Sequence, residues 1–409
     1  MSSKIVDLCQ ITTGKLDANA EVQEGQYPFY TCAEHPTTID QYSFDDDVVL
    51  IAGNNASANF HLNRFSGKFD AYQRTYVLTA KSGTNLDYVF YSLKLLLGLL
   101  KKQAQGSQTK FLTRSILDNL EVNDLSKDKQ QRITNILSEI DQKIELNNKI
   151  NEELEKTAKL IYDYWFVQFD FPISKEQAIA MGDPSLEGRP YKSSSGAMVY
   201  NEKLKRDIPE GWSDTTVKDF EPNIVTGKTP STKDPSNFGN DVPFVCIGDV
   251  RGNLHVVSTE LSLSDKGANL QKNKYLPAGS ICVTCIATVG LVAFAAFESQ
   301  TNQQLNSIVC GDEQNKEYLF FSLKNFFKFS VGAKTGNTFA NMNKGDFGDI
   351  KILAPCPYLV KSYHDTVAPM FAKALNNSME SKELKGLRDW LLPMLMNGQV
   401  SVSDSLKWT

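Results

Sequence analysis

The sequence predicts an α+β protein in which two similar globular α/β domains are separated by two long antiparallel helices of coiled-coil-like character. Two observations lead to this prediction: short motifs recur in the same order in both halves of the chain, and each half ends in a long helical pattern. The 409 residues, of which 41% are hydrophobic and 22% charged, suffice for two or three domains with hydrophobic cores. The chain is therefore expected to have a pseudo-two-fold internal repeat.

A short phrase opens each copy of the repeat, ITTGK at 11–15 and IVTGK at 224–228, and predicts a strand followed by a turn at Gly14 or Gly227. The segments that match further along are YPFYTC (27–32) with VPFVCI (242–247), DDDVVLIAG (45–53) with PAGSICVTCIATVG (277–290), DAYQRTYVLT (70–79) with QTNQQLNSIV (300–309), LDYVFYSLKLLL (86–97) with KEYLFFSLKNFF (316–327), and QGSQTKFLTRS (105–115) with KTGNTFANMNK (334–344). Because their order is the same in both halves, we interpret them as an internal duplication.

The long helical patterns cover 126–168 and 358–396, where apolar residues recur at steps of three and four. Ser126 is a plausible N-cap for the first helix. Pro369 and Pro393 predict a kink or an early stop in the second, because proline lacks the N–H of a helical hydrogen bond.

The apolar stripe of each helix is narrow and needs a partner, since an isolated helix is held mainly by tertiary packing. The other helix of the same chain, packed antiparallel, is the nearest candidate. Asn147 and Asn148 lie near the middle of the first stripe. They either fix the register of the pair or form a solvated polar turn.

These patterns also predict where the domains begin and end. The predicted parts are a first domain at 1–124, a central long helix at 125–171, a linker at 172–207, a second domain at 208–357, a C-terminal long helix at 358–400 and a tail at 401–409.

The sequence lacks the motifs of several catalytic classes. GKT at 227–229 is not a phosphate-binding loop, because Pro222 stands where that motif needs glycine. Cys282 and Cys285 are expected in a buried strand, where positions three apart face opposite sides and cannot share a metal. The four histidines are scattered, and no nuclease or methyltransferase signature is present. We therefore expect no catalytic site, no metal and no cofactor in this chain.

The chain is also expected to be cytoplasmic and not bound to a membrane. No apolar run reaches the ~18 residues of a membrane span, and the N-terminus does not resemble a secretory signal. Seven cysteines, an odd number spread thinly, fit a reducing compartment.

The charge distribution favours contact with DNA, although the net charge of −5 by itself argues against it. Residues 94–114 contain five basic residues and no acidic one, and 318–344 contain four and none. Both basic islands occupy matching places in the repeat. A local basic surface can contact phosphates, because charges beyond a Debye length of roughly 10 Å are screened.

Both islands include polar loops whose amides, hydroxyls and guanidiniums suit phosphate oxygens and base edges. Arginine can form two hydrogen bonds with guanine, and glutamine or asparagine with adenine. For any single residue we slightly favour the simpler interpretation, that the polar side chain caps a strand at the surface; for the loops as groups we favour DNA. The side chains predicted to contact DNA are Lys15, Arg64, Gln73, Arg74, Lys101, Lys102, Gln105, Ser107, Gln108 and Lys110 in the first half, and Lys228, Arg251, Asn302, Gln303, Gln304, Lys334, Thr335, Asn337 and Lys344 in the second.

Three stretches resemble the specificity (S) subunits of type I restriction–modification systems: YDYWFVQFDFP (162–172), IPEGW (208–212) and LRDWLLPMLMNGQV (387–400). The resemblance covers nearly the whole chain, including the first half from YPFYTC to YVL. The first half departs from the pattern because it has no equivalent of IPEGW.

This resemblance implies a non-catalytic subunit with two target-recognition domains, each reading one half of a bipartite double-stranded DNA target. The helices would set the unread spacer and, with adjoining regions, dock two modification subunits that use S-adenosylmethionine to methylate adenine. Restriction subunits would add translocation driven by ATP, with Mg, and cleavage.

Two alternatives come from other classes of protein. One is a protein–protein adaptor that recruits partners through its paired helices, which the acidic net charge favours. The other is a stand-alone enzyme such as a nuclease fused to its own reader, which the motif search disfavours. Binding to random-sequence duplexes separates the adaptor from the DNA reader.

Overall fold

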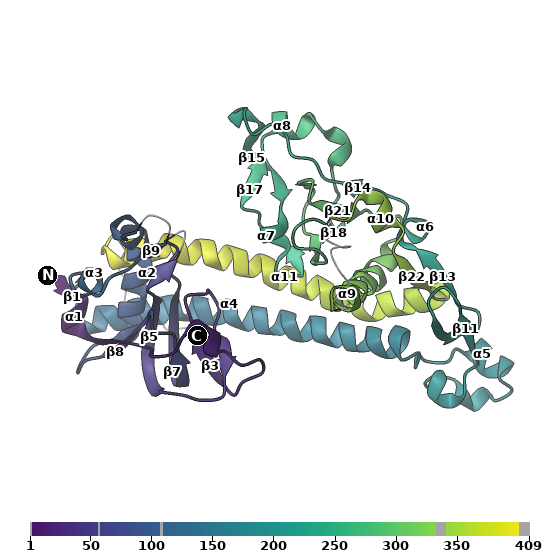
Figure 1. The fold of residues 1–409 in the computed structure, drawn as a ribbon, viewed down its shortest axis with the longest axis horizontal. Coiled ribbons are helices and arrows are strands. Elements are labelled where there is room, and N and C mark those ends of the chain that lie inside the picture. Colours follow the sequence, from purple (N-terminus) through teal and green to yellow (C-terminus); the bar gives the residue numbers. More distant parts are fainter. Residues whose placement is uncertain (1, 56–57, 107–108, 333–340, 401–409) are drawn as a thin grey trace. The chain divides into compact units, whose positions relative to one another are not determined.

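The computed structural model of the chain describes residues 2–55, 58–106, 109–332 and 341–400 (Figure 1). They form two compact units: residues up to Lys143 together with those from Leu384 onward, and Ile144–Glu383. Each unit holds one copy of the repeat and a segment of each long helix. The predicted fold class is confirmed, whereas the predicted domain limits stay a prediction.

The first unit is built on a sheet with strand order β2-β8-β5-β7-β3-β4. Its apolar face carries helix α2, whose buried Val89 and Leu93 share a core with Val49, Ile51 and Leu78 of the sheet. The elements of this unit are β1 (Ser2–Lys4), α1 (Ile5–Leu8), β2 (Cys9–Thr13), β3 (Tyr27–Tyr30), β4 (Thr37–Ile39), β5 (Phe44–Ala52), β6 (Asn54–Asn55), β7 (Leu62–Ala71), β8 (Thr75–Ala80), α2 (Leu86–Gln103), β9 (Lys110–Phe111), α3 (Arg114–Asp118), β10 (Glu121–Asn123), the start of α4 (Lys127–Tyr162) and the end of α11 (Pro357–Met396).

The second unit has two larger sheets, ordered β14-β21-β18-β19-β16 and β17-β15-β20, and two strand pairs, β11-β12 and β13-β22. Its elements are the end of α4, α5 (Lys175–Ala180), β11 (Met198–Asn201), β12 (Arg206–Pro209), β13 (Ser213–Thr216), α6 (Val217–Phe220), β14 (Ile224–Thr226), β15 (Phe238–Val245), α7 (Ile247–Val250), β16 (His255–Val256), β17 (Leu261–Leu263), α8 (Asp265–Asn269), β18 (Ile281–Thr284), β19 (Val292–Ala295), β20 (Gln300–Thr301), β21 (Leu305–Ile308), α9 (Lys316–Gly332), α10 (Lys344–Gly348), β22 (Lys351–Ala354), and most of α11 (Pro357–Met396).

The two units repeat the same strand pairing. The order β2-β8-β5 in the first unit corresponds to β14-β21-β18 in the second. Ile11 pairs with Leu78, and Ile224 pairs with Ile308 in the same register. The internal duplication inferred from the sequence therefore holds at the level of strand register.

Gly14 and Gly227, the glycines of the two matching motifs, have similar environments in the two units. A Cβ atom on Gly14 would lie 1.8 Å from the carbonyl oxygen of Ala71, and one on Gly227 would lie 2.0 Å from that of Asn302. Neither glycine lies in a turn, and neither has a positive φ, so the predicted turn is wrong at both places. Glycine is required because two backbone segments approach closely.

The long helices α4 and α11 pack antiparallel within each unit, as predicted (Figure 1). In the first unit Ile133 and Leu137 of α4 share a core with Leu392 and Leu395 of α11. In the second unit the Tyr363 hydroxyl of α11 donates to the carbonyl of Ala158. The later residues of one helix thus meet the earlier residues of the other.

A polar layer of Asn147, Asn151, Asn377 and Ser381 interrupts the seam in the second unit. Asn147 is 1% exposed and donates 2.8 Å to Glu380 Oε2. Asn377 donates 2.9 Å to Asn151 Oδ1. Asn147 therefore lies in the helix contact, which favours the register interpretation, whereas Asn148 is exposed.

The prolines do not end the second helix, so of the two predicted outcomes, a kink or an early stop, the early stop is wrong. Helix α11 runs from Pro357 to Met396 through both Pro369 and Pro393. Val367 and Phe371, on either side of Pro369, are buried in the core of the second unit. This packing outweighs the lost hydrogen bond.

The segment 172–207, predicted as a linker, is folded. It contains α5 and β11 and the start of β12. Tyr191 is buried and stacks on Phe171 at 4.7 Å, and Phe171 stacks on Trp212 at 5.2 Å. Its irregular composition concealed this because its order comes from scattered aromatic contacts and not from periodic apolar residues.

Cys282 and Cys285 face different cores, as expected for positions three apart at a strand. Burial raises the pKa of Cys282 to about 11, so its thiol stays protonated. The two cysteines do not converge on a shared site.

Candidate DNA interface

A hollow of about 430 Å³ lies in the first unit, where β2 ends, β8 begins and β9 crosses. Its lining residues are Thr13, Gly53, Gln73, Arg74, Tyr76, Phe111, Leu112, Thr113 and Arg114. The hollow brings together Gln73 and Arg74, which were predicted to contact DNA.

Backbone hydrogen bonds fix the walls of this hollow. The Gly53 amide donates 2.7 Å to the Arg74 carbonyl, and the Leu112 amide donates 2.8 Å to the Gly53 carbonyl. The Tyr76 hydroxyl donates 2.9 Å to the Leu112 carbonyl. Burial raises the pKa of Tyr76, an effect that Arg114 and Arg74 partly offset.

The two arginines and the one glutamine that line the hollow differ in how far other groups bind them. Arg114 donates 2.7 Å to the Ile11 carbonyl and 2.7 Å to Asp118. Gln73 donates its amide to Asp17. The exposed Arg74 guanidinium lies 5.4 Å from the centre of the Phe111 ring and, within the described part of the chain, makes no hydrogen bond or ion pair.

The second unit has the same backbone arrangement around Gln304. The Cys285 amide donates 2.8 Å to the Gln304 carbonyl, and the Met342 amide donates 2.8 Å to the Cys285 carbonyl. These two bonds correspond to those at Gly53. Gln304 therefore occupies the position of Arg74.

The Gln/Asn cluster of the second unit is held by its own hydrogen bonds. Asn302 is buried and donates 3.0 Å to Gln304 Oε1, and Thr229 donates to Gln303. Thr229 comes directly after the IVTGK motif at 224–228. In the first unit Asp17, the partner of Gln73, comes shortly after the matching ITTGK motif at 11–15.

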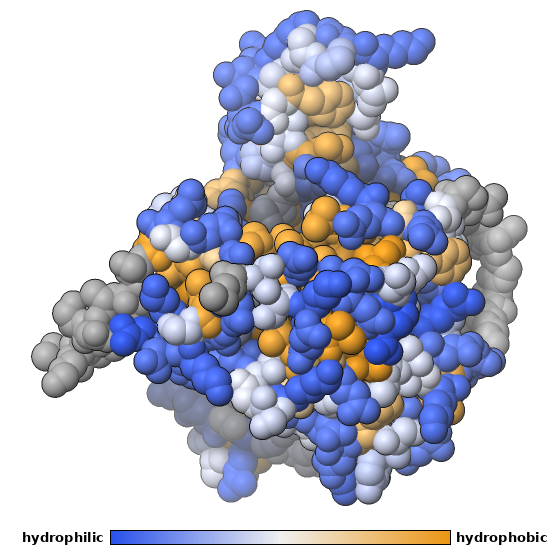
Figure 2. All heavy atoms as spheres, turned by 90° about the vertical axis from the view of Figure 1, so that its left-hand side faces the viewer, coloured by the Kyte–Doolittle hydropathy of each residue, from blue (hydrophilic) through white to orange (hydrophobic). Residues whose placement is uncertain are grey.

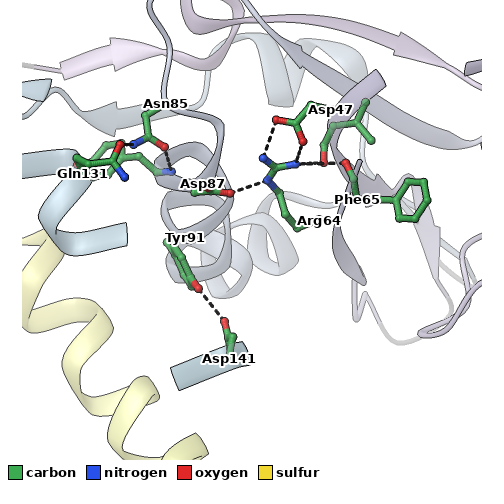
Figure 3. A network of polar contacts seen from close by, with 10 residues as sticks. Asp47, Arg64, Phe65, Asn85, Asp87, Tyr91, Gln131 and Asp141 are labelled. Carbon is green, nitrogen blue, oxygen red and sulfur yellow. Dashed lines mark hydrogen bonds and ion pairs between the residues drawn. The ribbon is translucent and has the colours of Figure 1, made fainter. Parts of the chain in front are cut away.

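Arg64 is engaged within the first unit (Figure 3). Its guanidinium bonds both carboxylate oxygens of Asp47 and lies 2.7 Å from Asp87. Burial opposes its charge, but the two carboxylates raise the pKa of Arg64. Contact with DNA at this position would first require those ion pairs to break.

The other predicted residues are dispersed. Lys15, Lys102 and Lys228 are exposed, and Lys344 begins helix α10. Gln105 is exposed but bonds Phe111 through its backbone. The remaining side-chain contacts are Lys101 with Asn59 (3.1 Å), Lys110 with the Gly106 carbonyl (2.8 Å) and Arg251 with Thr288 (3.3 Å). Ser107, Gln108, Lys334, Thr335 and Asn337 lie outside the described residues.

Part of the charge of the two basic islands is neutralised by partners from elsewhere in each unit. Lys94 lies 3.7 Å from Asp141 of α4, and Lys324 pairs with Glu155 of the same helix. Counting charges along the chain therefore overstated the basic character of these islands.

Phe111 and Arg114 are among the lining residues that were not predicted to contact DNA, although Arg114 was counted in the first basic island. Arg114 follows the N-cap Thr113 of α3 as Lys344 follows the N-cap Asn343 of α10, so the repeat itself could have identified it. On the face shown in Figure 2, hydrophobic residues form patches between hydrophilic ones.

The described residues contain no group of three or more His, Cys, Asp or Glu side chains placed to hold a metal ion. Across the same ranges, every helix is too short or too polar to cross a membrane.

Two equivalent units, with corresponding polar positions at the same place in each fold, define a duplicated recognition protein. The chain belongs to the family described as the type I restriction modification DNA specificity domain, whose sequence model matches residues 1–156 and 209–358. It is a specificity subunit, and its role is in DNA sequence specificity.

Relatives and solved structures of this family resemble the chain over most of its length. The type I restriction enzyme HindI specificity subunit of Haemophilus influenzae is 36% identical over 327 residues, which cover 71% of each chain. The MjaIX specificity subunit of Methanocaldococcus jannaschii is 26% identical and covers 79% of this chain and 71% of its own. The crystal structure of an S subunit from M. genitalium shares the fold, with a TM-score of 0.56 at 14% identity over 97% of this chain and 95% of that one.

Proposed function

We propose that this chain reads a bipartite double-stranded DNA target, one half with each unit, as the non-catalytic subunit of a type I restriction–modification complex. Two modification subunits methylate adenine within the target, and restriction subunits translocate and cleave DNA. S-adenosylmethionine, ATP and Mg are held by those partner subunits. This chain contributes sequence recognition and a scaffold.

The observation that carries this proposal is the atomic equivalence of the two units. The Tyr88 hydroxyl donates 2.8 Å to the Asn123 carbonyl, and the Tyr318 hydroxyl donates 2.8 Å to the Leu353 carbonyl. Two copies of one domain in one chain suit two half-sites, as a symmetric dimer suits a palindrome.

The exposed apolar residues of the long helices support the docking of two like partners. Leu160 of α4 is 67% exposed and Trp390 of α11 is 55% exposed. They are separated along the chain by the same interval as Tyr88 and Tyr318, so they hold equivalent places in the repeat. Two copies of one modification subunit would each find the same surface.

The decisive experiment assembles the chain with its modification subunits and maps the methylated adenines on random-sequence duplexes. We expect methylation within one motif made of two specified parts and an unspecified spacer. Methylation without sequence preference would refute the proposal. A single undivided motif would refute the assignment of one half-site to each unit.

A second experiment tests whether the first basic island, residues 94–114, contacts DNA. Lys101→Glu with Lys102→Glu reverses two exposed charges and should lower DNA affinity at least tenfold while the complex still assembles. The matched control, Lys127→Glu with Lys129→Glu, makes the same change in the first turn of α4, where acidic residues suit the helix dipole. Equal affinities for both double variants would remove Lys101 and Lys102 from the interface.

The adaptor alternative makes a different prediction. An adaptor would assemble with partners through Leu160 and Trp390 but would not retain duplex DNA from a random library. The chain by itself is expected to cleave no DNA with any added divalent metal.

A further inference from the structure

We propose that Arg74 and Gln304 are the paired specificity positions of the two units, with Arg74 reading guanine in one half-site and Gln304 reading adenine in the other. This inference rests on the proposed function and assigns its chemistry to one side chain in each unit. It makes the two half-sites different at the equivalent base.

The two positions are equivalent by their backbone contacts. The Arg74 carbonyl accepts the Gly53 amide at 2.7 Å, and the Gln304 carbonyl accepts the Cys285 amide at 2.8 Å. Each position also lies in the turn that leads into the second strand of its sheet, β8 or β21. The scaffold therefore presents different side chains from the same point.

Arg74 is prepared for a ligand with two acceptors. Its guanidinium lies over the Phe111 ring, which holds a planar group in place without occupying its N–H donors. In the described part of the chain these donors have no acceptor. Guanine offers O6 and N7 in the major groove at the spacing of the guanidinium fork.

Gln304 is prepared in another way. Asn302 Nδ2 donates 3.0 Å to Gln304 Oε1, which orients the amide plane and leaves a second lone pair on that oxygen. A glutamine amide can accept from adenine N6 and donate to adenine N7. The hydrogen bond from Asn302 thus does for Gln304 what the Phe111 ring does for Arg74.

The residue at the neighbouring bridge position also differs between the two units. Phe111 pairs with Asn54, and Asn341 pairs with Ile286 at the corresponding bridge of the second unit. The aromatic ring under the arginine is therefore replaced by an amide where the reading residue is glutamine. A guanidinium gains from an aromatic face, whereas a neutral amide has less need of one.

The neighbouring glutamines do not distinguish the two units. Gln73 and Gln303 are the same residue type at equivalent positions, and each bonds the segment after the doubled glycine, through Asp17 or Thr229. A contact from either would be common to both half-sites. The difference between the half-sites is thus assigned to positions 74 and 304.

The test uses the complete complex with its modification subunits and selects bound duplexes from a random library. In Arg74→Gln we expect one guanine of the motif to be replaced by adenine, with the other half-site unchanged. Gln304→Arg should produce the reverse change in the other half-site. Loss of a bidentate contact should reduce discrimination at that base by roughly 5-fold to 150-fold.

Arg74→Lys keeps the charge and removes the fork, so it should lose the guanine preference while keeping most of the affinity. The matched control is Lys102→Gln, which removes a charge outside the hollow. It should weaken binding to all sequences alike and leave the motif intact. Phe111→Leu should weaken the guanine preference more than the affinity, since Phe111 is a positioning residue.

The outcomes separate this inference from the proposed function. If the wild-type complex selects no motif, the proposed function fails. If the wild type selects a bipartite motif that Arg74→Gln and Arg74→Lys both leave unchanged in identity and strength, only the assignment of Arg74 is overturned. If Gln304→Arg leaves the motif unchanged, the assignment of Gln304 as the adenine-reading residue is overturned.

Discussion

The two copies of the repeat are most alike inside and least alike at the rim of the hollow. Inside, Tyr88 and Tyr318 make the same hydrogen bond, and the glycines of the doubled phrase make the same close approach. At the rim, arginine over an aromatic ring in one copy corresponds to glutamine beside asparagine in the other. Between these two copies, the interior contacts that hold the fold are the same, and the side chains of the surface loops differ.

A second difference is that the second copy has an aromatic cover that begins at the end of α4. A short π-helical turn, Asp163–Val167, leads into Phe171, which stacks with Trp212. These residues come from the stretches that resemble the family most closely. Their role here is packing, since Phe171 and Trp212 are buried in the core of the second unit.

The largest effect is expected where the two interiors are most alike. Gly14→Ala and Gly227→Ala would each place a Cβ within 2.0 Å of a backbone carbonyl oxygen, so each should destabilise its own unit by more than about 4 kcal/mol. Hydrogen exchange, measured peptide by peptide, would show which unit unfolds. Gly98→Ala in α2 is the control, since its Cβ meets nothing within 4 Å and should stabilise by roughly 0.5–1 kcal/mol. Normal protection in both glycine variants would contradict the shared close approach.

The aromatic cover should produce the next largest effect, and only in the second unit. Trp212→Ala removes a buried indole and should cost about 3–5 kcal/mol. Trp390→Ala, at an exposed position, should change stability by less than about 0.5 kcal/mol and instead weaken partner assembly. Thermal unfolding and size-exclusion chromatography with the modification subunits measure both quantities. If Trp212→Ala and Trp390→Ala lost the same amount of stability, the assignment of Trp212 to packing and of Trp390 to partner docking would be contradicted.

A pH dependence should also distinguish the two units. Burial against Phe294 lowers the pKa of His255 from its ordinary 6.5 to about 4, whereas His35 and His61 of the first unit are not buried. Between these values the unfolded chain binds a proton that the folded unit does not. The second unit should therefore lose on the order of 3 kcal/mol as pH falls from 6.5 to 4. His255→Phe should remove this loss; an unchanged pH profile by hydrogen exchange would contradict it.

The smallest effect should be the same in both copies. Tyr88→Phe and Tyr318→Phe each remove one hydrogen bond to a backbone carbonyl and should each cost about 1 kcal/mol. Tyr200→Phe, at an exposed position, is the control and should cost almost nothing. A cost at Tyr88 but none at Tyr318, by thermal unfolding, would show that the repeat is not equivalent in energy.

Much of the fold could be predicted because buried residues recur at regular intervals in the sequence. The collinear motifs and the apolar stripes were enough for the repeat and for the antiparallel helices. The continuation of α11 through Pro369 was not predictable, since it depends on the burial of Val367 and Phe371. The order of 172–207 was missed because Tyr191 contacts Phe171 across twenty residues of irregular chain.

The candidate site was less predictable than the fold because it depends on contacts between distant segments. The sequence indicated Gln73 and Arg74 correctly as neighbours in a polar loop. It could not show that Phe111 lies beneath Arg74, or that two carboxylates hold Arg64. Nor did it show which lysines of the basic islands are neutralised by α4. Whether these residues contact DNA stays a prediction.

The polar layer in the helix seam limits errors of alignment. Apolar stripes alone would tolerate a slip of one helical turn, about 5.4 Å. Such a slip would leave the buried amides of Asn147 and Asn377 without partners, at a cost of about 1–3 kcal/mol each. Under the proposed function, one turn exceeds the 3.4 Å step between base pairs. Under the proposed function, the four side chains of the polar layer would thus restrict the DNA target to one spacing between its half-sites. Without them, targets whose spacing differs by a base pair or two would also fit.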